Sequence, residues 1–233
     1  MTMHKNNYEW YSRVDRGFEE ARRVGKPVLL FFYSETCFFC NQMDMVVYPQ
    51  QNVADLIQGE FVPVRITPDN PDVFRAYAVN TVPAFIVTGT DGVECERRSG
   101  SLDAEALVAF CLLALGKFYH DLHETQKAQQ YMERLINSYP QSPHAPEAVF
   151  LQGVYRYLIS EDPVHLKTSL FALVKNYPDS IWVRRSLVLH CHPSTVADWD
   201  AYRKKRRDYW ESRDAYLKAY FTYYNGPSGH QIR

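Results

Sequence analysis

VLLFFYSETCFFC, residues 28–40, joins an unbroken apolar run to two cysteines that are separated by two phenylalanines. An apolar run of this length, bounded by turn residues, is typical of a buried strand. The tripeptide Gly-Lys-Pro at 25–27 comes just before it and ends an amphipathic helix predicted over residues 8–24. Residues 37–48 are predicted to form the next helix. The two cysteines are therefore placed where a buried strand ends and a helix begins.

The rest of the first half continues the alternation of strands and helices. Pro63 lacks the N–H that a central strand needs, so the strand around it is expected to be irregular or at an edge. Asp91-Gly92 is a hairpin signal between two strands, and Ser101 or Asp103 is the expected cap of a helix. Strands and helices in this order predict an α/β sandwich around a mixed sheet. The further strands are predicted at 61–66, 84–88 and 93–97, and the further helices at 53–59, 72–78 and 103–115.

The second half contains no credible strand and shows one internal echo. Residues 135–142, LINSYPQS, return 38 residues later as LVKNYPDS at 173–180. A period of this size is typical of stacked helical hairpins. A second unit over about 147–180 has Val154 where the tetratricopeptide pattern expects glycine. The residues that fit that pattern are Leu115, Gly116, Tyr119, Ala128 and Pro140 in the first unit, and Tyr157 and Pro178 in the second.

The length of 233 residues exceeds the usual size of one domain, and two domains are predicted. Their ranges are 1–113 for the α/β domain and 114–233 for an all-helical, tetratricopeptide-like domain. Because two repeat units are few for a freestanding array, helices at 180–189 and 195–224 are expected to supply the missing faces. The second of these is a long C-terminal helix with tyrosine and tryptophan at helical spacing.

Composition and charge exclude several classes of function. A formal net charge of -1 gives no pull toward nucleic acid or an anionic membrane. The basic run at 203–207 is surrounded by acidic residues and is expected to be a solvated helix face. The polar N-terminus lacks a secretory signal, and the apolar run at 27–33 is too short to span a bilayer. We therefore expect a cytoplasmic protein without a membrane or nucleic-acid partner.

The cysteine pair has a clear chemical use at the start of a helix. Cys37 sits where unpaired backbone N–H groups and the helix dipole favour a thiolate, so it is the candidate nucleophile. Cys40, one turn on, is close enough to resolve a mixed disulfide. A zinc site would need two more ligands, and His190-Cys191-His192 lies far away in sequence. An inert pair is the other alternative, and Cys95 and Cys111 are expected to be buried structural thiols.

Residues 8–113 resemble the thioredoxin superfamily, in a branch similar to the C-terminal domain of membrane thiol–disulfide interchange proteins. The stretches that carry the resemblance are GKPVLL at 25–30, CFFCNQM at 37–43, FVPV at 61–64, YAV at 77–79, TVPAF at 81–85, Asp91-Gly92 and Gly100. The resemblance implies a thioredoxin fold in which Pro83 is a cis-proline facing the cysteines. It also implies that Val82 offers its backbone to an extended substrate.

Three departures from the thioredoxin pattern concern the surroundings of the cysteines. Phe31 stands where thioredoxins have a buried acid that is thought to carry the proton when the second cysteine attacks. Thr36 replaces the usual tryptophan, and Phe38-Phe39 replaces Gly-Pro, which makes the rim around Cys37 more apolar. Glu35 is expected to be a solvated loop residue.

The sequence thus predicts a thiol–disulfide oxidoreductase, acting as a reductase on protein or peptide disulfides, without a cofactor or a metal. Cys37 and Cys40 are the predicted catalytic residues, and Val82, Pro83, Thr36, Phe38 and Phe39 are predicted to bind substrate. The helical repeats are expected to bind an unidentified protein partner. One alternative is a non-enzymatic adaptor in which the thioredoxin fold is a scaffold, and another is a metal-binding module that uses the same two thiols.

Overall fold

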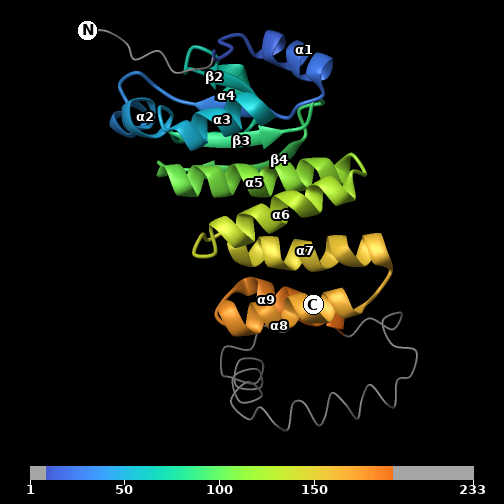
Figure 1. Cartoon of the computed structure of the whole chain (residues 1–233). Coiled ribbons are helices and arrows are strands. Elements are labelled where there is room, and N and C mark those ends of the chain that lie inside the picture. Colours follow the sequence, from blue (N-terminus) through green and yellow to red (C-terminus); the bar gives the residue numbers. More distant parts are fainter. Residues whose placement is uncertain (1–8, 191–233) are drawn as a thin grey trace, which may run out of the picture. The chain divides into compact units, whose positions relative to one another are not determined.

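The computed structural model describes residues 9–190, with the side chains of 188–190 left out. Figure 1 shows a sheet flanked by helices, followed by helices alone. The elements are α1 (Val14–Val24), β1 (Val28–Phe32), α2 (Phe38–Gln42), the π-helical segment η1 (Met43–Val47), α3 (Gln51–Glu60), β2 (Val62–Ile66), α4 (Pro71–Ala76), β3 (Ala84–Thr88), β4 (Glu94–Ser99), α5 (Ala104–Asp121), α6 (Thr125–Ser138), α7 (Ala145–Ser160), α8 (Val164–Asn176) and α9 (Ile181–His190).

The four strands form a mixed sheet in the order β2-β1-β3-β4, which confirms the predicted thioredoxin fold. β1 runs parallel to β2 and antiparallel to β3, and β4 runs antiparallel to β3. All five residues of β1 are buried, as expected for the central strand of a sheet covered on both faces. The chain therefore reaches Cys37 directly from an inner strand of the sheet.

β2 lies at the edge of the four strands, as Pro63 predicted. The N–H of Val62 donates to the carbonyl of Pro27, whereas the N–H of Arg65 donates to Tyr11 on the other side. Because successive N–H groups of a strand alternate in direction, the nitrogen of Pro63 faces away from β1, where no ladder bond is lost. Tyr11 pairs with this outer side, so α1 begins at Val14 and not at residue 8 as predicted.

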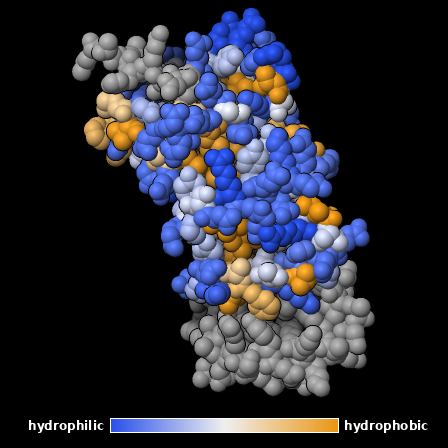
Figure 2. Space-filling model, viewed as in Figure 1, coloured by the Kyte–Doolittle hydropathy of each residue, from blue (hydrophilic) through white to orange (hydrophobic). Residues whose placement is uncertain are grey.

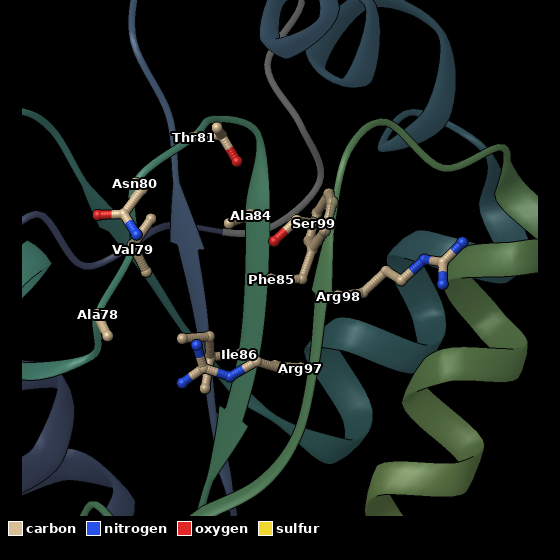
Figure 3. A pocket seen from close by; sticks show the side chains of 10 residues that line it. All are labelled: Ala78, Val79, Asn80, Thr81, Ala84, Phe85, Ile86, Arg97, Arg98 and Ser99. Atoms are coloured by element: carbon tan, nitrogen blue, oxygen red, sulfur yellow. The ribbon is translucent and has the colours of Figure 1, made fainter.

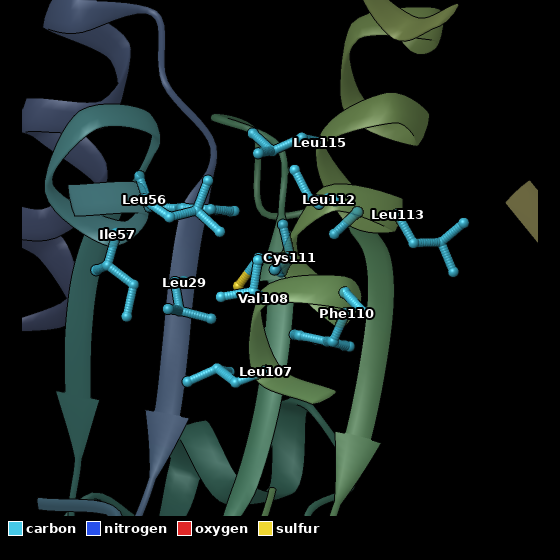
Figure 4. Packing of buried hydrophobic residues seen from close by; sticks show 14 of the residues in the cluster. Leu29, Leu56, Ile57, Leu107, Val108, Phe110, Cys111, Leu112, Leu113 and Leu115 are labelled. Atoms are coloured by element: carbon cyan, nitrogen blue, oxygen red, sulfur yellow. The ribbon is translucent and has the colours of Figure 1, made fainter. Parts of the chain in front are cut away.

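Two apolar clusters cover the two faces of the sheet. Alternate residues of β1 point to opposite faces, with Leu29 and Phe31 in the larger cluster and Leu30 in the smaller one beside α1 and α4. Figure 4 shows side chains of α3 and α5 gathered around Leu29. The larger cluster draws on β1, β3, α3 and α5, extends into η1, α6 and α7, and includes Cys40.

α5 is apolar around its whole circumference because it is covered on both sides. Every residue from 107 to 115 is buried. One side of α5 contacts β3, β4 and α3, and another contacts α6 (Figure 1). Asp103 is its N-cap and accepts a hydrogen bond from Ala106 N–H at 2.8 Å. The predicted domain boundary at 113/114 falls inside this helix and stays a prediction.

The helical half is all-α over the described residues, and two of its helices end alike. Tyr139 and Tyr177 end α6 and α8 with nearly equal dihedral angles, and their N–H groups donate to Leu135 and Leu173. The sequence echo therefore corresponds to a repeated helix end. The predicted helix 195–224, Cys191 and the basic run 203–207 lie outside the described residues. Within residues 9–190, no helix combines the length and the apolar character needed to cross a membrane.

Candidate active site at Cys37 and Cys40

A short loop after β1 places Cys37 at the N-cap of α2. Its sulfur accepts a hydrogen bond from the N–H of Cys40 at 3.2 Å, so a thiol takes the place of the usual hydroxyl or carboxylate cap. The Cys37 N–H donates to the carbonyl of Ser34 at 3.0 Å. The sulfur of Cys37 therefore faces the N-terminal N–H groups of the helix.

The loop before β3 closes the other side of Cys37. The peptide bond between Val82 and Pro83 is cis, and the Cys37 thiol donates to the carbonyl of Val82 at 3.7 Å. The structure thus brings together the two segments that the sequence placed at the site, although they are 45 residues apart.

The two cysteines lie in different environments. Cys37 is partly exposed, whereas Cys40 is fully buried. Burial, and next the hydrogen bond with Cys37, raise the pKa of Cys40 to about 12. An accessible first thiol and a protonated second thiol suit a pair in which Cys37 reacts first. Cys111 is fully buried, as predicted, whereas Cys95 is only partly buried.

Large apolar side chains surround the exposed sulfur. Phe38 is 75% exposed and Phe39 is 53% exposed, with their rings edge to face. Met45 and Val46 are also exposed, and sequence reasoning missed them. They follow Phe38 and Phe39 by seven residues and lie in the π-helical segment that continues α2. Figure 2 shows apolar colouring over α2.

Phe31, which stands where thioredoxins have a buried acid, belongs to a cluster of aromatic side chains. The Phe31 ring is fully buried and stacks on Tyr33 at 5.6 Å and on Phe85 at 5.1 Å between ring centroids. The guanidinium of Arg65 lies 4.7 Å from the centre of the Trp10 ring and bonds to the carboxylate of Asp44. Thr36, by contrast, is exposed and its hydroxyl meets that of Ser34. Asp44 and Arg65 were not among the predicted site residues.

A hollow lies next to the Val82–Pro83 segment, on the side of the sheet away from α5 (Figure 3). None of the predicted site residues lines it. Arg97, which borders it, bonds to Glu94 and to the carbonyl of Tyr77, so its charge is already paired. The hollow is lined by residues 78–81, 84–86 and 97–99. Within residues 9–190, no three His, Cys, Asp or Glu side chains are placed together to hold a metal ion.

The first half of the chain is similar to known proteins. A family profile described as a thioredoxin-like domain matches residues 14–113. Spermatogenesis-associated protein 20 of Homo sapiens is 29% identical over 73 residues, which is 31% of this chain and 9% of that protein. Thiol:disulfide interchange protein DsbD 2 of Pseudomonas aeruginosa is 29% identical over 104 residues, 42% of this chain and 18% of that protein. The chain thus spans less than a fifth of these two relatives.

Two solved structures are each similar to about two fifths of the chain. A thioredoxin from Thermus thermophilus is 26% identical with a TM-score of 0.38, and covers 41% of this chain and 78% of its own. The oxidised DsbD C-terminal domain of Neisseria meningitidis is 21% identical with a TM-score of 0.36, and covers 42% of this chain and 91% of its own. With the profile match and the observed mixed sheet, residues 14–113 of this chain are a thioredoxin-like domain.

Proposed function

We propose that this protein is a thiol–disulfide oxidoreductase that reduces disulfides in protein or peptide substrates. The observation that carries the proposal is the position of the Cys37 sulfur. It caps α2, accepts the N–H of Cys40 and lies 3.7 Å from the carbonyl of Val82 beside the cis-proline. A nucleophilic cysteine, a resolving thiol and a backbone segment that pairs with the substrate are the three parts that thiol–disulfide exchange with a polypeptide needs.

The reaction has two exchange steps. The Cys37 thiolate attacks one sulfur of the substrate disulfide, which forms a mixed disulfide and releases the other substrate sulfur as a thiolate. Cys40 then attacks Cys37, forms the Cys37–Cys40 disulfide and releases the second substrate thiolate. The substrate gains two electrons and the cysteine pair loses two. An external dithiol, such as a reduced oxidoreductase, must then reduce the pair again.

Substrate binding is assigned to the segments on either side of Cys37. The backbone of Val82, next to Pro83, pairs with an extended substrate segment. Thr36, Phe38 and Phe39 form the rim, and two exposed phenylalanines favour a segment with large apolar residues near its disulfide. This rim is therefore part of the proposed substrate-binding site.

The helical half is proposed to recruit a protein partner and so to raise the concentration of one substrate at the cysteines. Large apolar side chains that stay exposed on α7 and α8 support this role, among them Leu158, Ile159 and Val164. A cytoplasmic location also belongs to the proposal, because a reductase needs a compartment that keeps thiols reduced.

A redox titration of the full chain tests the reductase. In the Cys95→Ser, Cys191→Ser background, we expect Cys37 and Cys40 to interconvert reversibly between dithiol and disulfide near the thioredoxin value of about -270 mV. Cys37→Ser should abolish reduction of a disulfide-containing protein and leave the circular dichroism spectrum unchanged. Unchanged turnover in Cys37→Ser would exclude the mechanism, and a potential near about -120 mV would indicate an oxidant.

The second candidate function is an adaptor that uses the thioredoxin fold as a scaffold. Phe31 favours it, because no carboxylate stands at that position beside the buried thiol of Cys40. In an adaptor the cysteine pair does not cycle at any accessible potential, whereas partner binding survives Cys37→Ser. The same titration therefore separates the two functions.

A further inference from the structure

We propose that Asp44, held in place by Arg65, accepts the proton that Cys40 loses when it resolves the mixed disulfide. This inference rests on the proposed oxidoreductase function and names a proton acceptor for its second step. Arg65 is a positioning residue in this proposal because it acts through the carboxylate.

The surroundings of Cys40 show why an internal acceptor is needed. Its side chain is fully buried in the larger apolar cluster, so solvent does not reach the sulfur. The pKa of this thiol, about 12, keeps it protonated at neutral pH. A thiol must become a thiolate before it attacks a disulfide. The proton must therefore leave through a neighbouring side chain.

Asp44 lies on the same helical face as Cys40. It follows Cys40 by four residues along the continuous helix formed by α2 and η1, a spacing that places side chains on one face. The charge of Asp44 also contributes to the raised pKa of the Cys40 thiol, after burial and the contacts with Cys37. The Asp44 side chain is 29% exposed. Asp44 is therefore a carboxylate on the Cys40 face of the helix that solvent also reaches.

Arg65 fixes the carboxylate in this position. Two guanidinium nitrogens bond to the two oxygens of Asp44, in the bidentate arrangement that gives the strongest geometry. The guanidinium is itself held among aromatic rings, 4.7 Å from the centre of Trp10, 5.3 Å from Tyr33 and 5.8 Å from Phe31. The Arg65 guanidinium thus contacts both the Asp44 carboxylate and the Phe31 ring. Phe31 occupies the position of the buried acid of thioredoxins, so Arg65 lies between that position and Asp44.

Burial and charge tune Asp44 in opposite directions. Burial raises the pKa of Asp44 above its ordinary value, whereas the positive charge of Arg65 and its hydrogen bonds lower it, and the net shift is upward. Arg65 from β2 bonds to the carboxylate, and the charge of Asp44 acts on Cys40 from α2. A carboxylate with a raised pKa is a stronger base than an ordinary aspartate.

The proton on Cys40 moves to the Asp44 carboxylate, and the resulting thiolate attacks Cys37. The Cys37–Cys40 bond forms while the bond from Cys37 to the substrate sulfur breaks. The departing substrate thiolate takes a proton from solvent, and Asp44 releases its proton to solvent.

Rapid mixing with the chromogenic disulfide dithiobis-nitrobenzoate separates the two exchange steps in the full chain. Attack by Cys37 releases one coloured thiol, and attack by Cys40 releases the second. In the Cys95→Ser, Cys191→Ser background, Asp44→Asn should slow the second release about 10-fold or more at neutral pH. The first release should change by less than about twofold. The difference should shrink as the pH rises, because hydroxide then deprotonates Cys40.

Three variants serve as controls. Asp44→Glu keeps the carboxylate and should restore most of the second release. Glu35→Gln removes an exposed acid from the loop before Cys37 and should change neither release. Arg65→Lys keeps the charge but loses the bidentate arrangement, so its second release should lie between wild type and Asp44→Asn.

The proposal is wrong if Asp44→Asn releases the second thiol at the wild-type rate, or if Glu35→Gln slows it equally. If Asp44→Asn does not fold, the pH profile of the wild type decides. Its second release must fall as the pH drops through the pKa of Asp44, because the protonated acid accepts no proton. Absence of the first release in the wild type would overturn the oxidoreductase function itself, so the two failures are distinguishable.

Discussion

At the scale of single residues, the two cysteines of one short motif have opposite surroundings. Cys37 sits on the rim with its sulfur at a helix N-terminus, and Cys40 is enclosed by the apolar cluster. Only two residues separate the cysteines, and the turn of the helix points the Cys40 side chain into the core. The order of the two exchange steps follows from this difference in access.

Alkylation checks this difference directly. In the folded, reduced protein at about pH 8, iodoacetamide should label Cys37 and leave Cys40 almost unlabelled, because a thiol with a pKa of about 12 is about 0.01% thiolate there. Raising the pH toward that value should bring Cys40 labelling up. Peptide mass spectrometry measures both sites, and the urea-denatured chain, where both react alike, is the control. Equal labelling of the two cysteines in the folded protein would contradict the assignment.

The apolar rim gives a second prediction at this scale. Phe39→Ser should lower kcat/KM for a disulfide peptide with aromatic residues beside its cysteines by about 5- to 10-fold, because about 1 kcal/mol of apolar contact is lost. It should hardly affect a peptide with serine and glycine there. Val93→Ser, an exposed apolar residue in the hairpin next to β4, is the matched control and should affect neither peptide. An equal loss on both peptides would argue against a binding role.

At the scale of elements, the two helical hairpins make the same close contact. A Cβ on Gly116 of α5 would meet Met132 and the Ala128 carbonyl of α6. A Cβ on Gly153 of α7 would meet Ser169 and the His165 carbonyl of α8. The tetratricopeptide pattern expects this glycine at position 154, which is Val154. In the structure the close contact is made one residue earlier, at Gly153. The tetratricopeptide assignment itself stays a prediction.

Substitution at Gly153 measures the value of that contact. Gly153→Ala should lower the free energy of unfolding by about 1–3 kcal/mol, because the new methyl group overlaps Ser169 and lies 3.1 Å from the His165 carbonyl oxygen. Gly59→Ala in α3 is the matched control, since no atom lies within 4 Å of its added Cβ. That variant should gain about 0.5–1 kcal/mol from helix propensity. Urea titration compares the two, and a stabilised Gly153→Ala would show that the helices separate easily.

At the scale of the whole described unit, α5 belongs to both halves of the chain. Its Lys117 ammonium contacts Glu96 of β4 and Glu147 of α7, each at 2.5 Å. Tyr131 of α6 donates to Glu60 of α3 at 2.8 Å. These bonds join the sheet side of the molecule to the helical hairpins. The thioredoxin-like domain and the first hairpin therefore share one core.

Removing Lys117 tests that connection. Lys117→Met should lower the free energy of unfolding by about 2 kcal/mol, because two half-buried carboxylates then face each other without a cation. Arg16→Met removes a mostly exposed ion pair with Glu19 and should change stability by less than about 0.5 kcal/mol. A single unfolding transition is expected in both variants. If Lys117→Met lowered the free energy of unfolding no more than Arg16→Met, the ion pairs of Lys117 would not stabilise the fold.

The same junction should respond to pH through His144. Burial lowers the pKa of His144, and the charges of Arg98 and Lys117 lower it further against the opposing effect of Glu96. A histidine with a lowered folded pKa binds protons more readily in the unfolded chain, so stability falls as the pH drops below about 6.5. His144→Gln should lose less stability than wild type between about pH 7 and 5. Parallel pH profiles of the two proteins would exclude this contribution.

Sequence alone determined the local features of this protein. Burial periodicity and turn chemistry predict the apolar strand at 28–33, the helix after Cys37, an irregular or edge position for Pro63, and the echo at 135–142 and 173–180. These act over a few neighbouring residues, so they can be recognised along the chain. The cis bond at Pro83 was implied by the resemblance to a known family.

Tertiary structure decided what depends on partners distant in the chain. Asp44 meets Arg65 only because η1 packs beside β2, and Lys117 finds Glu96 and Glu147 only where α5 lies between β4 and α7. The pairing of Tyr11 with β2 likewise delays the start of α1. An ion pair has no periodicity, and its energy depends on distance and burial, which are fixed only when the strands and helices pack.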